Sequence, residues 1–342
     1  MRLVSRPLVA ILAGSTLALG ACGSTDTSGA GDGAEDGFPV TVTHALGETV
    51  IDSKPERVVA VGSAANAEVA LALDIVPVAM PRTDYGDEDG DGVLPWVTER
   101  LDDIDADTPI LFDETEGIDF ESVSETEPDV ILAATSGLTP EDYETLSKIA
   151  PVVAYPDLPW TASWRETITM NSEALGKAEE GQELIADLTE RIESSAAEYP
   201  ELDGVSAAFI NISVDDLSTV LVAASADARA SYLADIGLTT PTVVEQNSKD
   251  AEAFRFSISA EEIDAFDDTD IVLGYSGEGT SLLDTLRSNP LLSRMSAAER
   301  GSVAEIVDGS PLAAAVSPSA LGIPWSIDEL LDRLATAARQ LP

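Results

Sequence analysis

The chain has 342 residues, of which 44% are hydrophobic, with 18 Lys and Arg against 63 Asp and Glu. That length exceeds one typical domain core and predicts about two domains. The formal charge of −45 disfavours binding to nucleic acid or to anionic lipid headgroups. One cysteine excludes a disulfide framework and a thiolate zinc site, and one histidine makes histidine-based metal binding or catalysis a poor hypothesis.

Residues 1–21 have the pattern of a secretory signal peptide. Arg2 and Arg6 precede an apolar run, Leu8–Leu19, that is shorter than the roughly 20 residues of a membrane span. The single cysteine follows in the tetrad LGAC, which resembles the bacterial lipobox. We therefore expect Cys22 to carry a lipid that anchors the mature protein to the extracytoplasmic face of the cell membrane.

The remaining sequence divides into segments of different periodicity. Residues 22–37 contain, apart from the cysteine, no apolar side chain larger than alanine and predict a flexible tether. Residues 38–177 open with a hairpin pattern and then alternate short apolar runs with helical stretches. Residues 178–199 keep helical spacing without a strand signal, and the alternation resumes over 200–342. The sequence therefore predicts two doubly wound α/β lobes joined by a single long helix.

Short apolar runs locate the expected strands and helices. In the first lobe, strands are predicted at Val58–Val61, Val76–Met80, Val130–Ala133 and Val152–Ala154, and helices at Asn66–Leu73, Phe120–Glu125 and Glu141–Ile149. In the second lobe the rhythm continues with Val205–Ile212, Val220–Ala223, Ala228–Ile236, Ile271–Leu273 and Leu282–Leu286.

A weak internal repeat indicates that the two lobes are equivalent. The segment FESV precedes PDVIL in the first lobe, and EEI precedes TDIVL in the second. Aligning Asp129 with Asp270 places Glu121 over Glu262, each eight residues upstream. The repeat therefore predicts a glutamate at the same place in each lobe.

Three longer segments carry a family resemblance: THALGETVIDSKPERVVAVG at 43–62, PDLPWTASWRETITMNSEALGKAEEG at 156–181 and SPSALGIPWSIDELLDRLATA at 317–337. With the lipobox, the tether and the joining helix, they resemble bacterial class III periplasmic-type substrate-binding proteins, most closely the iron–siderophore group. The resemblance covers the chain beyond about residue 38. It implies a ligand cleft between the lobes, a rather rigid linking helix and delivery of cargo to an ABC importer.

Two motifs suggest other chemistry but depart from their patterns. The segment DEDGDG at 87–92 begins like a calcium loop, but its twelfth position is Thr98 where an EF-hand needs glutamate, so we interpret it as a solvated acidic loop. The segment GYSG at 274–277 resembles a nucleophile elbow whose fifth position is Glu278 and not glycine. Because His44 lies on the N-terminal hairpin, we expect it to be structural and expect no catalytic triad.

Aromatic side chains are scarce and follow the predicted strands. Ligands in open α/β sheets lie beyond the carboxyl ends of strands, where Tyr85, Trp160, Trp164 and Tyr275 are expected. With Trp96, these residues are candidate ligand contacts, and packing within the lobe is the alternative for each.

Four arginines lie in segments that follow strands: Arg82, Arg165, Arg229 and Arg255. Arg165 and Arg229 are predicted in first turns of helices, where a cation opposes the helix dipole and needs a compensating anion. That anion is either a ligand or one of the many acidic side chains. As a set spread over both lobes, the four arginines are candidate donors to siderophore oxygens.

We therefore expect a non-enzymatic, monomeric receptor for a ferric siderophore. It needs no intrinsic cofactor or resident metal, because the iron is carried within the ligand. Haem is a rival cargo, with Tyr85, Tyr155 or Tyr275 as axial ligand, and cobalamin is another. A lipid-anchored enzyme or adhesion module is the alternative from a different class. The strong negative charge slightly favours hydroxamate over trianionic catecholate complexes.

The repeated glutamates are candidates for docking to an importer. In related class III receptors, one glutamate per lobe meets arginines of the permease, and Glu121 and Glu262 resemble that pair. Ordinary surface charge is the alternative in so acidic a chain.

Overall fold

The computed structural model describes residues 37–249, 254–277 and 279–342, all within one compact unit. The expected signal peptide (1–21), Cys22 and all but the last residue of the expected tether (22–37) lie outside the described residues. Of the helices in the described ranges, none combines the length and the apolar character that crossing a membrane requires.

The predicted N-terminal hairpin is confirmed as β1 (Val40–His44) paired antiparallel with β2 (Gly47–Ile51). The His44 ring is buried: its Nδ1 accepts a hydrogen bond from the Leu46 amide and its Nε2 lies 3.0 Å from the Thr49 hydroxyl. That hydroxyl donates to the Val152 carbonyl. These contacts give His44 a structural role in joining the hairpin to the first sheet.

The first sheet has five parallel strands in the order β5-β4-β3-β6-β7. They are β3 (Val58–Ala60), β4 (Ala79–Pro81), β5 (Ile110–Phe112), β6 (Val130–Leu132) and β7 (Val152–Val153). Strand β5, a three-residue strand between acidic segments, was not predicted from the sequence. The side chains of β3 and β6 are all buried, as expected for parallel strands with helices on both faces.

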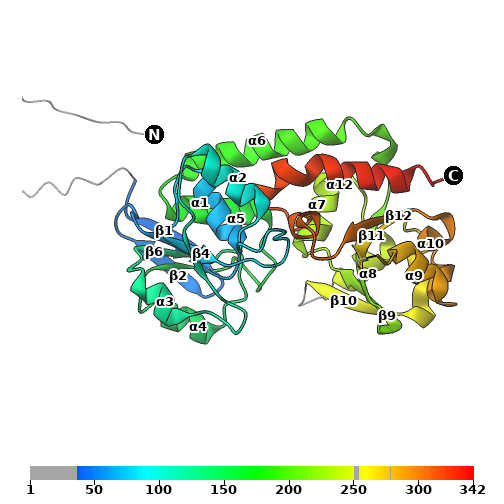
Figure 1. Ribbon diagram of the computed structural model, residues 1–342, viewed down its shortest axis with the longest axis horizontal. Helices are drawn as coiled ribbons and strands as arrows, with labels where there is room; N and C mark the ends of the chain where they lie inside the picture. The colour runs from blue at the N-terminus through cyan, green and yellow to red at the C-terminus, as the bar shows by residue number, and fades with distance from the viewer. Residues whose placement is uncertain (1–36, 250–253, 278) are drawn as a thin grey trace, which may run out of the picture. The chain divides into compact units, whose positions relative to one another are not determined.

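Five helices cover this sheet: α1 (Ala64–Ala72), α2 (Pro95–Asp103), α3 (Phe120–Glu125), α4 (Pro140–Leu146) and α5 (Trp164–Ala174). Helices α1 and α5 pack on one face, and α3 and α4 pack on the other (Figure 1). Asn66 of α1 donates to the carbonyls of Val61 and Thr135 and accepts from the Thr135 amide. One buried side chain therefore fixes the segments that follow β3 and β6, the two central strands.

The long helix α6 (Ala178–Ala196) lies between the two sheets in the sequence. It runs beside α12 (Gly322–Ala338), as Figure 1 shows in green and red. Leu188 and Ile192 face the core, while Asp328 of α12 binds both Arg191 and Ser195. The amphipathic pattern of residues 178–199 thus predicted the helix correctly.

The second sheet is mixed and has the order β10-β9-β8-β11-β12. Its strands are β8 (Ala207–Ser213), β9 (Asp216–Ala223), β10 (Arg255–Ser259), β11 (Ile271–Ser276) and β12 (Val303–Val307). Strand β9 is antiparallel to both neighbours. The expected α/β lobe is confirmed, and within this sheet β9 is the exception to parallel pairing, because the two-residue link between β8 and β9 allows a hairpin but no parallel crossover.

Short helices connect these strands: η1 (Pro200–Leu202), α7 (Ala228–Asp235), α8 (Thr242–Ser248), η2 (Ala260–Phe266), α9 (Leu282–Ser288), η3 (Leu292–Arg294), α10 (Ser296–Arg300) and α11 (Pro311–Ala315). Strands β10 and β12 were not predicted from the sequence.

The two sheets repeat one strand order, with the first strand at the centre. Asp129 accepts hydrogen bonds from the amides of Glu56 and Arg57, just before β3. Asp270 accepts from the amide and hydroxyl of Ser206, just before β8. The two aspartates that the internal repeat aligned therefore perform the same task, which confirms the repeat.

Candidate functional site

A cavity of about 720 Å³ is lined by residues from both lobes. Gly62, Arg82, Glu114 and Thr135 line it from the first lobe, and each lies just beyond the carboxyl end of one of the parallel strands β3 to β6. Ligands bind at this edge of open α/β sheets, and the volume lies within the range of ligand pockets. The cavity is therefore the candidate binding site.

Five of the nine predicted contact residues line this cavity. Arg82, Tyr85 and Trp96 come from the first lobe, and Arg229 and Tyr275 come from the second. Tyr275 lies within β11 and not after it, because the strand continues to Ser276. The fold thus gathers residues that are up to 193 positions apart around one cavity, although their contact with a ligand remains a prediction.

Tyr85 bridges the cavity from the first lobe to the second. Its hydroxyl donates a 2.7 Å hydrogen bond to Asp308, which directly follows β12, while its side chain stays 44% exposed. Partial burial and the neighbouring Asp308 carboxylate raise the pKa of the Tyr85 hydroxyl. Tyr85 is therefore a neutral phenol in the cavity wall.

Both arginines of the cavity already have carboxylate partners. Arg82 pairs with Asp84 at 2.7 Å and also donates to the carbonyls of Gly90 and Asp91. Arg229 is held by both oxygens of the buried Asp227. Burial alone would lower the pKa of Arg229, but the hydrogen bonds and charge of Asp227 raise it. The two guanidinium groups are fixed in place and largely neutralised.

Trp164 and Arg165 do not line the cavity. The Trp164 ring is 2% exposed and its Nε1 donates to Asp235 of α7, which also pairs with Arg165 at 2.8 Å. The expectation that they contact ligand is therefore not supported, because α5 turns both side chains toward the second lobe. The compensating anions that the helix dipole demands are Asp235 for Arg165 and Asp227 for Arg229.

Trp160 and Arg255 also lie outside the residues that line the cavity. Trp160 is 46% exposed and its ring lies against Gly137, where a Cβ would come within 2.2 Å of the indole Nε1. Arg255 was expected in a loop but is the first residue of β10, with its guanidinium 5.1 Å from the Phe254 ring.

Sequence reasoning missed a buried carboxylate in the cavity wall. Glu68 of α1 is 1% exposed and accepts hydrogen bonds from the Trp96 indole and from the amides of Leu321 and Gly322. Burial raises the pKa of Glu68, although these bonds oppose the shift. The available signal was a single charged residue within the otherwise uncharged helix AANAEVALA.

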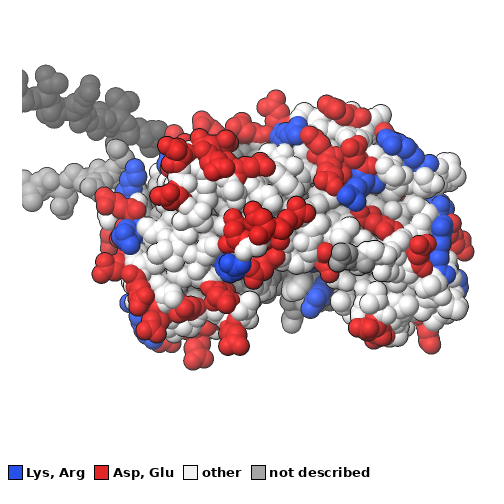
Figure 2. Space-filling view, viewed as in Figure 1, with Lys and Arg blue, Asp and Glu red and all other residues white. Residues whose placement is uncertain are grey.

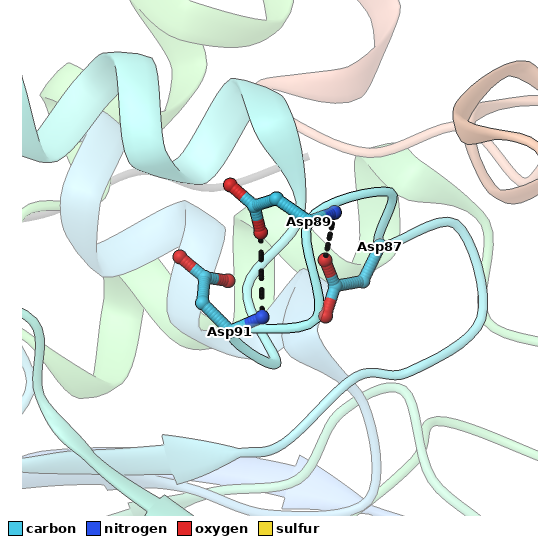
Figure 3. A group of neighbouring side chains, drawn as sticks. All are labelled: Asp87, Asp89 and Asp91. Atoms are coloured by element: carbon cyan, nitrogen blue, oxygen red, sulfur yellow. Dashed lines mark hydrogen bonds between the residues drawn. The ribbon is translucent and has the colours of Figure 1, made fainter.

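The acidic loop lies beside the cavity but binds its own backbone. One carboxylate oxygen of each of Asp87, Asp89 and Asp91 lies within 4.8 Å of the other two. Figure 3 shows the amide of Asp89 donating to Asp87 and that of Asp91 donating to Asp89. Asp87 also accepts from the amides of Gly90 and Gly92. These bonds organise the loop that holds the Arg82 guanidinium.

The two candidate docking residues are exposed at equivalent places. Glu121 lies in the first turn of α3, which leads to β6, and Glu262 lies in η2, which leads to β11. Acidic side chains are spread widely over the face drawn in Figure 2. Position in the repeat therefore distinguishes these glutamates better than charge does.

Comparison with family models matches residues 59–308 to the family described as periplasmic binding protein. The chain belongs to the periplasmic binding protein family. Its members are substrate-binding components and not enzymes, so the predictions of a substrate-binding family and of a protein without catalytic activity are confirmed.

Two solved structures are similar over nearly 90% of the chain. PiaA of Streptococcus pneumoniae TIGR4, whose crystal structure is in complex with ferrichrome, is 40% identical, with a TM-score of 0.84, covering 88% of this chain and 99% of PiaA. A periplasmic solute binding protein from Mycobacterium smegmatis is 26% identical, with a TM-score of 0.70 and coverage of 89% and 100%.

A curated relative is the probable siderophore-binding lipoprotein YfiY of Bacillus subtilis (strain 168). It is 28% identical over 179 residues, which are 52% of this chain and 51% of YfiY. The match thus spans about half the length of that relative.

Proposed function

We propose that this chain is a lipid-anchored extracytoplasmic receptor that binds a ferric siderophore in the cavity between its lobes and delivers it to an ABC importer permease. The observation that carries the proposal is the cavity itself. It joins the aromatic rings of Tyr85, Trp96 and Tyr275 with two arginines in a space that fits a metal chelate. The similar protein PiaA was solved with ferrichrome, which supports the same class of ligand here.

Lipid anchoring rests on the lipobox around Cys22 and on the lipoprotein name of the similar YfiY. Delivery to a permease rests on family membership and on the equivalent glutamates of the two lobes. A monomer with one cavity suffices for this role, and the iron enters as part of the substrate.

Haem is a weaker candidate because the tyrosines are poorly placed to bind iron. A tyrosine ligand acts as phenolate, and the raised pKa of Tyr85 opposes deprotonation. Tyr155 is buried in the core of the first lobe. The Tyr275 hydroxyl lies 3.4 Å from the Ala313 carbonyl, to which it donates.

A ligand panel tests the proposal. Purified protein without residues 1–22 is titrated with ferric trihydroxamates, ferric catecholates, haem and cobalamin, with tryptophan quenching and thermal shift as readouts. We expect ferric trihydroxamates to quench the fluorescence and raise the melting temperature. Binding of haem or cobalamin alone, or of none of the panel, would contradict the assignment.

A further inference from the structure

Glu114 is a carboxylate of the cavity wall that was not among the predicted site residues. It follows β5 and belongs to the edge at which the parallel strands end. Its Oε2 accepts a 2.9 Å hydrogen bond from the Gly62 amide. Its Oε1 is buried and has no hydrogen-bond partner among the described residues.

An unpaired buried carboxylate oxygen is rare, because burial removes its hydration and nothing replaces it. The Glu114 carboxyl shows the effect, since burial raises its pKa and only the Gly62 amide opposes the shift. Such an atom in the wall of a binding cavity is therefore an acceptor that lacks a donor.

The Gly62 amide that binds the Glu114 carboxylate lies in a tightly packed turn. Gly62 has a φ of +80°, and a Cβ at this position would come within 2.7 Å of the Ser136 Cβ. The close approach of these two segments fixes the Gly62 amide, and with it one end of the Glu114 carboxylate. The Glu114 carboxylate is thus anchored to the wall through Oε2, which leaves Oε1 as the oxygen without a donor.

The other charged residues of the cavity also leave the Glu114 carboxylate without a positive partner. Arg82 is paired with Asp84, and Arg229 with Asp227, so neither arginine balances Glu114. Asp308 adds a further carboxylate, which accepts a hydrogen bond from the neutral phenol of Tyr85. The cavity therefore carries more negative than positive charge, which favours a ligand with a positive group.

We propose that Glu114 is a specificity-determining residue that binds an ammonium group of the chelate, so that the cavity prefers ferric complexes with a positive charge beside the metal-binding core. This inference rests on the proposed function. Because Oε1 is buried, the carboxylate turns toward the cavity when the ammonium arrives and keeps its bond to Gly62. A charge-assisted hydrogen bond of this kind is stronger than the bond to a neutral amide.

The test uses two ligands that differ by one charge. Ferrioxamine B is a ferric trihydroxamate with a terminal ammonium, and its N-acetyl derivative has the same metal centre without the charge. For the unaltered protein we expect the ammonium form to bind about tenfold more tightly. In Glu114→Gln we expect the preference to fall below about twofold, mainly through weaker binding of the ammonium form.

Glu116→Gln is the matched control, since it removes the same charge from an exposed side chain two residues away. It should retain the tenfold preference. An equal loss of both ligands in Glu114→Gln would make Glu114 merely structural and overturn the inference. Equal affinity of the unaltered protein for both ligands would overturn it without any variant, while the proposed function stood. Failure of the unaltered protein to bind any ferric chelate would overturn both.

Discussion

The Asp227 carboxylate is buried at the start of α7 and is bound by the backbone amide, the Nε and an Nη of Arg229. The guanidinium also lies 4.7 Å from the Phe209 ring. Removing one partner of a buried ion pair leaves the other charge uncompensated, which costs more than the pair itself contributes. Arg229 thus depends on Asp227 for its place in the cavity wall.

We expect Asp227→Asn to lower the free energy of unfolding by about 2 kcal/mol. The loss is smaller than for a fully buried ion pair, because the Arg229 side chain is partly exposed to solvent. Urea denaturation measures the change. Glu201→Gln, which breaks the exposed pair with Arg339, is the control and should cost less than about 1 kcal/mol. Equal losses in the two variants would show that burial of the Asp227–Arg229 pair does not increase its contribution to the free energy of unfolding.

Single residues were only partly predictable from the sequence. The helix dipole argument correctly required anions beside Arg165 and Arg229, but it did not distinguish a ligand from Asp235 and Asp227. Trp164 follows a strand, as a ligand contact should, yet the rotation of α5 places its ring in the core. The direction of a side chain depends on tertiary packing, which local sequence does not encode.

Among the elements, the N-terminal hairpin has a built-in response to acid. The His44 ring has both nitrogens engaged in the neutral form, and burial lowers its pKa below the ordinary value of 6.5. The unfolded chain therefore binds a proton at a pH where the folded chain does not. The folding stability that His44 contributes is complete above pH 6.5 and declines as the pH falls through the lowered pKa.

We expect the unaltered protein to lose stability between pH 7.5 and about 5.5 faster than His44→Gln. The acidic residues are common to both proteins, so the difference between their unfolding free energies isolates the imidazole. Urea denaturation at three pH values in this range provides the measurement. A difference that stays constant with pH would disprove the role of the neutral ring.

Elements with strong periodicity were predictable, whereas short ones were predictable only in part: β3, β6 and β7 were predicted from apolar runs, but β5, β10 and β12 were not. The apolar spacing of residues 178–199 identified α6, and the alternation of residues 38–52 identified the hairpin. Strand β5 has three residues, too few to show a period, and is defined by its pairing with β4. The antiparallel β9 was read as part of a strand–helix rhythm, because periodicity does not report the direction of a strand.

At the scale of the whole molecule, the repeat bears on the proposed docking to a permease. Two equivalent lobes present one exposed glutamate each, and ion pairs at an interface steer encounter and fix orientation more than they add affinity. We expect Glu121→Arg combined with Glu262→Arg to abolish uptake of the ferric siderophore by cells, while the affinity for ligand stays within about twofold.

Glu193→Arg combined with Glu299→Arg is the matched control, because it changes the net charge equally at two other exposed positions. Uptake should persist in that control. Normal uptake by a correctly folded Glu121/Glu262 double variant would reject the docking role, and loss of ligand binding would move these residues to the ligand site.

The hydrogen bonds of Glu68 also have a consequence for the order of folding. A chain emerges N-terminus first during synthesis and during export, so the residues of α1 become available to fold long before residues 321 and 322. Until those two amides arrive, the Glu68 carboxylate lacks two of its donors and keeps the Trp96 indole as a partner in an apolar setting. The first lobe therefore reaches its final stability only when α12, at the C-terminal end of the chain, docks on it.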